Sequence, residues 1–139
     1  MLALAALTVA CGSSSPTSPS STSSSTATVA AASISETWSS TVAVGAAKFY
    51  SFSVAENGTV NVTLSSVSGD FVPATVTLGL GIGQPSGTEC STTSTVNVSV
   101  QTTAPQLTGT YAPGVYCARV FDVGNLFAPA NFTVVVAHP

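Results

Sequence analysis

Charged side chains are scarce in this sequence. They make up 5% of its 139 residues, and the only two cations are Lys48 and Arg119. Nucleic-acid binding depends on several basic side chains that neutralise phosphates, so the sequence argues against a nucleic-acid partner. Docking on an anionic membrane surface needs a basic cluster as well. We therefore expect any attachment to a membrane to be covalent or hydrophobic.

Groups suited to catalysis or metal binding are also few. His138 is the single histidine and stands one residue from the C-terminal end, where chains tend to be frayed, so it would be a poorly held base. No two acidic residues have a spacing typical of a catalytic carboxylate pair. Cys90 and Cys117 have no nearby histidine to complete a tetrahedral metal site. We expect no enzyme activity, no catalytic residue and no metal site.

The chain begins with a short apolar run, residues 1–10, which ends in small residues directly before Cys11. About ten residues are too few for a bilayer, which takes roughly 20 in a helix, so we predict a signal peptide. Thr8-Val9-Ala10-Cys11 resembles the lipobox of bacterial lipoproteins, in which the cysteine after the cleavage site receives a diacylglyceryl group. The resemblance predicts a lipid anchor at Cys11 and a place in the bacterial cell envelope. The alternative is an ordinary secretory leader and a secreted protein.

A Ser/Thr/Pro-rich segment follows the leader. Residues 13–28 contain almost nothing else, so they have no apolar surface whose burial would offset the entropy of ordering the chain. We interpret residues 11–32 as a flexible tether. Residues 33–139 are then one folded domain, because about 105 residues suffice for a single core.

Apolar residues recur at every second position after residue 33, which is the period of a β-strand. Short strands separated by Gly and Pro turns, with no helical stretch, predict an all-β antiparallel β-sandwich of seven or eight strands. Asn57-Gly58 is a strong hairpin signal, so we expect the strand ending at Val54 to turn straight into the next one. The expected apolar faces include Trp38 and Val42; Tyr50, Phe52 and Val54; Val60, Val62 and Leu64; Val76, Leu78, Leu80 and Ile82; Val96, Val98 and Val100; and Phe132, Val134 and Val136.

Three glycines, Gly79, Gly81 and Gly83, share one face of the fourth expected strand. A face without side chains lets another group approach the backbone closely. Two interpretations stay open here. The face is either a shallow ligand surface or a place where a loop or a bulge packs against the strand.

The segment at residues 114–126 combines several signals. Strand alternation puts Arg119 and Phe121 on its outward face, and we expect the Asp122 carboxylate to accept backbone N–H groups in the turn that follows. With Cys11 used by lipid, Cys90 and Cys117 remain as an even pair in an oxidising compartment, so we predict a disulfide between them.

Three runs of sequence, ETWSSTVAVGAAKFYSFSVAENGTVNVTL, GVYCARVFDVGN and FTVVVAHP, together resemble the bacterial pre-peptidase C-terminal domain over residues 35–139. The resemblance implies a jelly-roll-like β-sandwich that accompanies exported enzymes and has no catalysis of its own. Some relatives bind calcium or polymeric ligands through acidic loops and exposed aromatic rings. Residues 75–83 carry no carboxylate where many members have an Asp-rich strand, which argues against calcium, and we expect no cofactor.

The sequence therefore predicts a non-catalytic module of the cell envelope that binds a polysaccharide or an envelope protein. The alternative is a structural envelope protein that associates with itself or with a neighbour and has no small ligand. Aromatic rings outside the expected core are candidates for a binding surface, because sugar rings stack on them; these are Phe49, Tyr111, Phe121 and Phe127. The candidate ligand face consists of Tyr111, Arg119, Phe121 and Asp122.

Overall fold

The alternation of apolar and hydroxyl side chains corresponds to a set of β-strands. The computed structural model describes residues 26, 28–99 and 101–139, so the expected signal peptide and Cys11 lie outside the described residues. The described part of the chain contains no helix long and apolar enough to cross a membrane. Its strands are β1 (Ile34–Val42), β2 (Ala47–Val54), β3 (Gly58–Ser68), β4 (Leu78–Ser86), β5 (Glu89–Val98), β6 (Leu107–Tyr111), β7 (Gly114–Asp122) and β8 (Ala130–His138).

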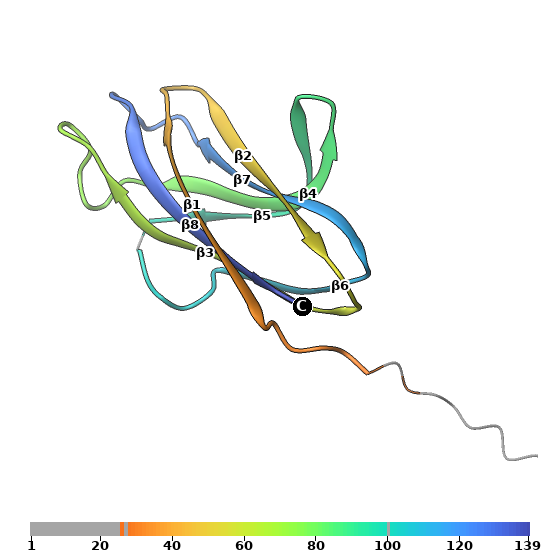
Figure 1. Cartoon of the computed structure of the whole chain (residues 1–139). Helices are drawn as coiled ribbons and strands as arrows, with labels where there is room; N and C mark the ends of the chain where they lie inside the picture. The colour runs from red at the N-terminus through yellow and green to blue at the C-terminus, as the bar shows by residue number, and fades with distance from the viewer. Residues whose placement is uncertain (1–25, 27, 100) are drawn as a thin grey trace, which may run out of the picture.

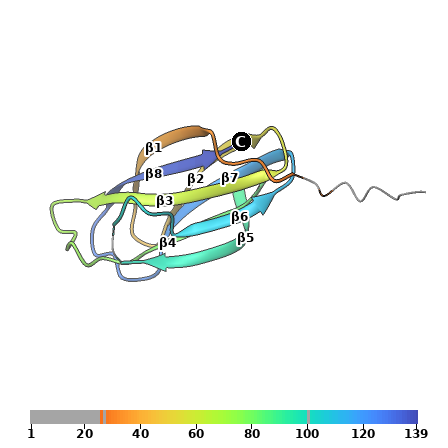
Figure 2. The ribbon, with the colours of Figure 1, turned by 90° about the horizontal axis from the view of Figure 1, so that it is seen from below.

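The strands form two four-stranded antiparallel sheets, in the orders β1-β8-β3-β6 and β2-β7-β4-β5. Every connection crosses from one sheet to the other except the one between β4 and β5. This is the strand order of a jelly roll, in which two sheets pack face to face (Figures 1 and 2). The all-β sandwich predicted from the sequence is confirmed.

The core lies between the two sheets. Side chains at alternate positions of β3, β4, β7 and β8 are almost completely inaccessible to solvent, as the period-two pattern predicts. Trp38 packs against the core from β1, with its ring 5.7 Å from that of Tyr50 and 5.2 Å from that of Phe132. The largest fully buried side chains are Phe132, Leu64, Leu78, Leu80, Ile82, Val42, Val60, Val62, Val120, Val134, Val136 and Cys117.

The expected hairpin at Asn57-Gly58 is wrong. β2 pairs with β7 and β3 pairs with β8 and β6, so the short connection between β2 and β3 passes from one sheet to the other. Neither Asn57 nor Gly58 has a positive φ, which a tight two-residue hairpin would require. Instead, the Asn57 carbonyl accepts a hydrogen bond from the Ala30 N–H, and Thr59 N donates to the Ala30 carbonyl. The segment before β1 thus forms a parallel bridge with Gly58 at the start of β3, and β6 and β8 flank the strand where a hairpin partner was expected.

The sandwich has two distinct ends. The segment before β1 enters beside the C-terminus, because Ser33 N donates to the His138 carbonyl, and the β2–β3 connection lies there too. The β1–β2, β3–β4 and β7–β8 connections lie at the opposite end (Figure 1). A ligand site formed by these connections therefore faces away from the segment through which the predicted tether joins the domain.

Candidate functional site

The candidate site is built on the outer face of the β2-β7-β4-β5 sheet. Arg119 on β7 lies directly across from Phe49 on β2 and from Gly81 on β4. Two residues further along β7, Phe121 lies across from Ala47 and Gly79. Since alternate residues of a strand point to the same side, Arg119, Phe121 and Phe49 share this outer face.

Phe121 lies over Gly79, and a Cβ atom at Gly79 would overlap the carbons of the Phe121 ring. The same ring supports Arg119, whose Cζ lies over it, 5.2 Å from its centre, in the geometry of a cation–π contact. Within the described residues, the Arg119 guanidinium has no carboxylate at ion-pair distance. Its N–H donors are thus held in place by an aromatic ring and not by an acid.

The other two glycines of β4 are covered by β5. A Cβ at Gly81 would lie 2.7 Å from the Thr92 methyl group, and one at Gly83 would overlap the Ser91 carbonyl. Of the two interpretations of the glycine face, close packing is therefore confirmed: its glycines are buried and do not form an open ligand surface.

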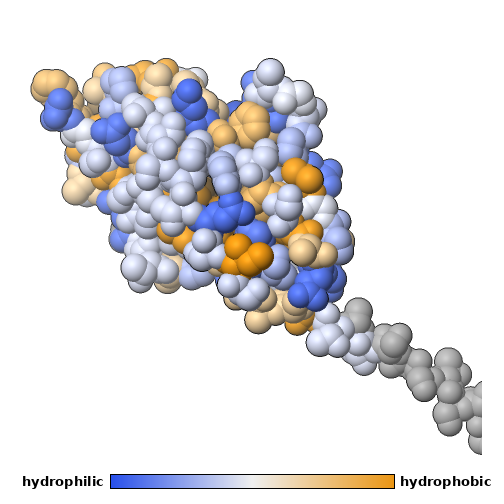
Figure 3. Space-filling view, in the orientation of Figure 1, coloured by the Kyte–Doolittle hydropathy of each residue, from blue (hydrophilic) through white to orange (hydrophobic). Residues whose placement is uncertain are grey.

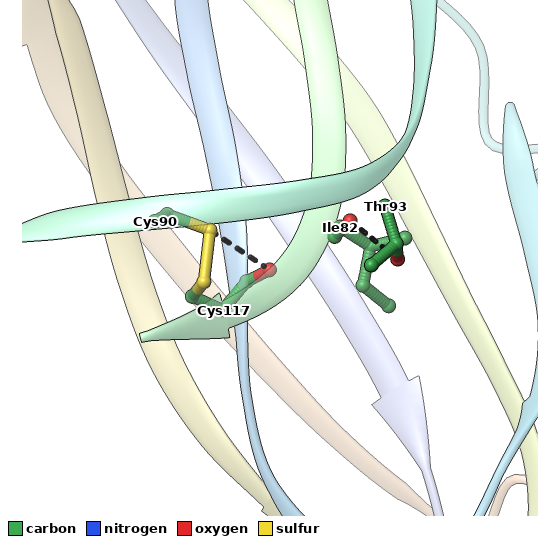
Figure 4. Close-up of a disulfide and its surroundings, with 4 residues drawn as sticks. All are labelled: Ile82, Cys90, Thr93 and Cys117. Carbon is green, nitrogen blue, oxygen red and sulfur yellow. Dashed lines mark hydrogen bonds between the residues drawn. A yellow bond between two sulfur atoms is a disulfide. The ribbon is translucent and has the colours of Figure 1, made fainter. Parts of the chain in front are cut away.

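A bulge between Ile82 and Gly83 lets the β4–β5 hairpin leave the plane of the sheet. Thr93 is the residue of β5 left without a partner by the register shift, and its hydroxyl donates a 3.3 Å hydrogen bond to the Ile82 carbonyl (Figure 4). The predicted disulfide, confirmed here, joins Cys90 of this hairpin to Cys117 of β7, with the two Cα atoms 6.0 Å apart (Figure 4). Cys90 Sγ also lies 3.5 Å from the Cys117 carbonyl oxygen, a contact without a hydrogen because the sulfur is bonded to sulfur.

An open groove of about 510 Å³ lies over this face, between the β4–β5 hairpin and the β1–β2 turn. Thr88 and Glu89, which immediately precede the half-cystine Cys90, form one wall. The disulfide therefore holds the wall of the groove against the sheet. The lining residues are Gly45, Ala46, Ala47, Lys48, Phe49, Thr88, Glu89, Arg119, Phe121 and Asp122.

Asp122 lies at one end of the groove, where its carboxylate connects the β1–β2 turn to the β7–β8 connection by hydrogen bonds. Its Oδ1 accepts hydrogen bonds from the backbone N–H groups of Gly124, Asn125 and Leu126, at 2.8, 3.1 and 3.2 Å, as the sequence predicts. Its Oδ2 accepts a fourth, of 2.8 Å, from Gly45 N in the β1–β2 turn. Burial alone would raise the pKa of Asp122, but these four bonds outweigh it and hold the pKa below its usual value. Both carboxylate oxygens therefore already accept hydrogen bonds from the backbone.

The groove gathers more charged side chains than any other part of this sparsely charged chain. Both of its cations, Lys48 and Arg119, line the groove, together with the acids Glu89 and Asp122. Because the Asp122 carboxylate is satisfied by backbone N–H groups, Lys48, Arg119 and Glu89 remain as charged groups that can meet a ligand. A group with an acceptor for the guanidinium and a donor for the carboxylate would match both.

Of the four residues expected to form a ligand face, three come together and one does not. Arg119, Phe121 and Asp122 line the groove. Tyr111 lies on β6 in the other sheet and packs edge-on against Tyr116, with the ring centres 5.1 Å apart. Burial, and then the neighbouring Tyr116, raise the pKa of Tyr111. Tyr111 is thus part of the packing around the core.

Sequence reasoning missed Lys48 and Glu89 as groove residues. Glu89 starts β5, and it reaches the groove because the bulge bends the hairpin over the sheet. A Pro-Ser-Gly-Thr turn between two strands marks a hairpin in the sequence, but its direction depends on the bulge. Among the aromatic rings expected at the surface, Phe127 is 94% exposed. Phe49 and Phe121 are half-buried in the groove.

A second polar cluster corrects the prediction that His138 is frayed. His138 pairs with Ile34 at the end of β8 and is 2% exposed. Its Nε2 lies 3.0 Å from Oε1 of Glu36, and its Nδ1 lies 3.1 Å from the Pro139 carbonyl oxygen. The Tyr50 hydroxyl donates to the other oxygen of Glu36. The prediction failed because strand pairing with β1, which is remote in sequence, fixes the last residues.

The network joins a buried imidazole to a partly exposed carboxylate, since the side chain of His138 is 3% exposed and that of Glu36 is 31% exposed. Tyr50 and then His138 donate to Glu36 and hold its pKa below its usual value, while the Glu36 carboxylate raises the pKa of Tyr50. The network joins β1 and β8 of one sheet to β2 of the other. We interpret it as a polar link between the two sheets.

Two exposed aromatic rings lie at the end of the sandwich opposite the entry of the N-terminal segment. Phe71, in the β3–β4 connection, is 81% exposed, and Phe127, in the β7–β8 connection, is 94% exposed. The two connections are neighbours, since Gly69 and Phe71 line a shallow depression of about 310 Å³ together with Ala128 and Pro129.

The outer face of the other sheet carries a different chemistry. Its exposed positions on β1 and β8 are uncharged, and hydroxyl groups pair across the strands: Ser39 and Thr133 are 2.8 Å apart, and Thr41 donates to Asn131 at 2.6 Å. Pale colours of near-neutral hydropathy dominate the face on which β1 and β8 lie in front (Figure 3). The groove with its charged side chains and this hydroxyl-rich surface thus belong to different sheets.

Comparisons with known proteins leave the site to be interpreted from its own geometry. The sequence matches no family model, and no curated protein matches it. Among the residues that the structure describes, no three His, Cys, Asp or Glu side chains are grouped as metal ligands.

Proposed function

We propose that this chain is a non-catalytic binding module of the bacterial cell envelope, and that it binds a polymeric ligand in the groove over β2 and β7. The observation that carries the proposal is the groove itself, which gathers Arg119, Phe121 and Phe49 beside Glu89 in a chain that has few charges anywhere else. An open groove suits a segment of a polymer better than a small molecule, which is typically enclosed on most of its surface.

The position of the groove supports this function. The β1–β2 turn and Asp122 lie at the end of the sandwich opposite the segment that precedes β1. A lipid on Cys11, proposed from the lipobox, and the tether at residues 11–32 would then place the membrane on one side and the groove on the other. The resemblance to the pre-peptidase C-terminal domain agrees with a role as an accessory domain.

The test is a retention assay with the purified 139-residue chain on insoluble polysaccharides and cell-wall material. Phe49→Ala should lower the affinity for a retained polymer at least about fivefold, the equivalent of about 1 kcal/mol. Phe127→Ala is the matched control, because it removes the same side chain from a position outside the groove. Failure of the wild-type chain to bind any polymer would contradict the proposed function.

A second candidate function is association with a protein, either another copy of the chain or a neighbour in the envelope. The observation that favours it is the pair of exposed rings, Phe71 and Phe127, in adjacent connections. Exposed aromatic rings are enriched at protein interfaces. Sedimentation of the wild-type chain and of Phe71→Ser/Phe127→Ser tests self-association: a dimer that the double substitution dissociates supports it, and a monomer at all concentrations contradicts it.

A further inference from the structure

The chemistry of the groove specifies a class of ligand. We propose that the polymer is an acidic polysaccharide whose sugar carboxylates bind Arg119. This inference rests on the proposed function, because it assigns a ligand to the same groove.

The guanidinium of Arg119 is held in position and has N–H donors available for an anion. Phe121 supports it from the ring face, and Phe121 is itself seated on Gly79, where no side chain is present. This leaves the planar set of N–H donors available, since no described carboxylate lies within ion-pair distance of Arg119. Guanidinium donors match the two oxygens of a carboxylate in a bidentate arrangement. The Phe121 ring therefore acts as a positioning residue.

The surroundings of Arg119 favour a sugar acid. Phe49 is the direct cross-strand neighbour of Arg119 and offers apolar surface to the C–H groups of a pyranose ring. On the opposite wall, Glu89 and Thr88 provide a carboxylate and a hydroxyl that can accept hydrogen bonds from sugar hydroxyl groups. A carboxylate, a ring with C–H faces and several hydroxyl groups occur together in a uronic acid residue.

The net charge of the chain means that an acidic polymer has to be recognised by contacts within the groove. The formal charge is -3, so the whole molecule repels a polyanion, and binding has to come from a specific contact. With only two cations in the groove, the affinity should depend far less on salt than that of a basic surface. An acidic polypeptide carries carboxylates too, but it lacks the ring hydroxyl groups that would meet Glu89.

The experiment compares polygalacturonate with its fully methyl-esterified form, which has the same backbone without charge. We expect the 139-residue chain to bind the acid form and to bind the ester at least about tenfold more weakly, which is the loss expected for a charged hydrogen-bonded pair. Arg119→Gln and Arg119→Lys should both lose this preference. Glutamine removes the charge, and lysine keeps the charge but lacks the planar pair of N–H donors that binds a carboxylate in a bidentate way. Thr37→Glu, on the outer face of β1 and outside the groove, lowers the net charge by the same one unit as Arg119→Gln and should keep the preference. Melting temperature and the intact disulfide confirm that each variant is folded.

The outcomes separate this inference from the proposed function. Equal binding of acid and ester, weakened by Phe49→Ala, would overturn the acidic ligand and leave a polymer-binding groove in place. Binding of poly-glutamate as tight as that of polygalacturonate would overturn the sugar identity. Retention on acid polymers that survives Arg119→Gln would overturn the role of Arg119. No retention on any polymer would overturn both proposals.

Discussion

The imidazole Nε2 of His138 lies 3.0 Å from Oε1 of Glu36, a residue 102 positions earlier in the chain. Together with the Tyr50 hydroxyl, this contact connects the first and last strands of one sheet to the edge strand of the other. The single histidine of the sequence is therefore a buried structural group at the end of the chain.

Replacing His138 should destabilise the domain. His138→Ala removes the contact with the Glu36 carboxylate, the contact with the Pro139 carbonyl oxygen and the packing against the Phe52 ring, whose centre lies 5.4 Å away. We expect a loss of about 1–3 kcal/mol in the free energy of unfolding, measured by denaturant titration. Glu56→Gln, at an exposed acid in the β2–β3 connection, is the control and should change little. Equal stability of His138→Ala and the wild type would contradict a structural role for the network.

Removal of the disulfide should weaken the fold and open the groove. The 27-residue separation between Cys90 and Cys117 corresponds to about 3.5 kcal/mol in the chain-entropy model. The double variant Cys90→Ala/Cys117→Ala should melt at a lower temperature and keep the far-ultraviolet signal of β-sheet. An unchanged melting temperature would refute the stabilising role.

The same double variant should also bind more weakly in the retention assay, because Glu89 is held beside the groove by its neighbour Cys90. Treatment of the wild-type chain with a reductant should reproduce this loss, and treatment of the variant should have no further effect. Full binding by the reduced protein would show that the hairpin does not need the disulfide to form the wall.

Two glycines of β4 should differ in their tolerance of a methyl group. At Gly79 an added Cβ meets the ring of Phe121, a side chain that can rotate away, whereas at Gly83 it meets the backbone carbonyl of Ser91. Gly83→Ala should therefore lower the melting temperature more than Gly79→Ala. Gly79→Ala should instead weaken ligand binding, because it displaces Phe121 from beneath Arg119. The reverse order of melting temperatures would contradict the packing described for this face.

Stability should fall at acid pH through two carboxylates. The pKa of Glu36 and that of Asp122 both lie below their usual values in the folded chain, so each carboxylate stabilises the fold at pH values above the usual range of about 4. This stabilisation is lost as the pH falls through the lowered values, because the unfolded chain binds protons first. Melting temperatures measured from pH 7 down to pH 2 should show the loss.

Asp122→Asn should flatten this acid dependence. The variant keeps a side-chain oxygen for part of the turn but no longer carries a titrating group. If the wild type and the variant lost stability in parallel between pH 5 and pH 2, roughly the range over which paired carboxylates titrate, Asp122 would not contribute to the pH dependence.

Local patterns in the sequence were sufficient for the fold class and for several contacts. Alternation along residues 114–126 placed Arg119 and Phe121 on one face, and the parity of cysteines gave the Cys90–Cys117 bridge. The acceptor role of Asp122 also follows from its immediate neighbours. These features depend on residues close together in the chain or on a count.

Features that depend on pairing between remote strands were not predictable in this way. Asn57-Gly58 has the composition of a hairpin, but the burial of β2 and β3 in different sheets overrides it. At the bulge in β3, the Gln106 side-chain amide bonds both the N–H and the carbonyl of Leu64, a contact over 42 positions with no local signal. Phe49 lies beside Arg119 through the strand order of the jelly roll, whereas Glu89, on the edge strand at the other side of the sheet, reaches the same groove through the bulge in the β4–β5 pair.

Ligand binding in the groove over β2 and β7 can be followed residue by residue in solution. The most direct test is to record amide chemical shifts of the isotope-labelled chain while oligogalacturonate is added. We expect the shifts to concentrate at Gly45, Phe49, Glu89, Arg119 and Phe121, and the hydroxyl-rich face of β1 and β8 to be unaffected. Shifts confined to the hydroxyl-rich face, or to the connections that carry Phe71 and Phe127, would contradict it.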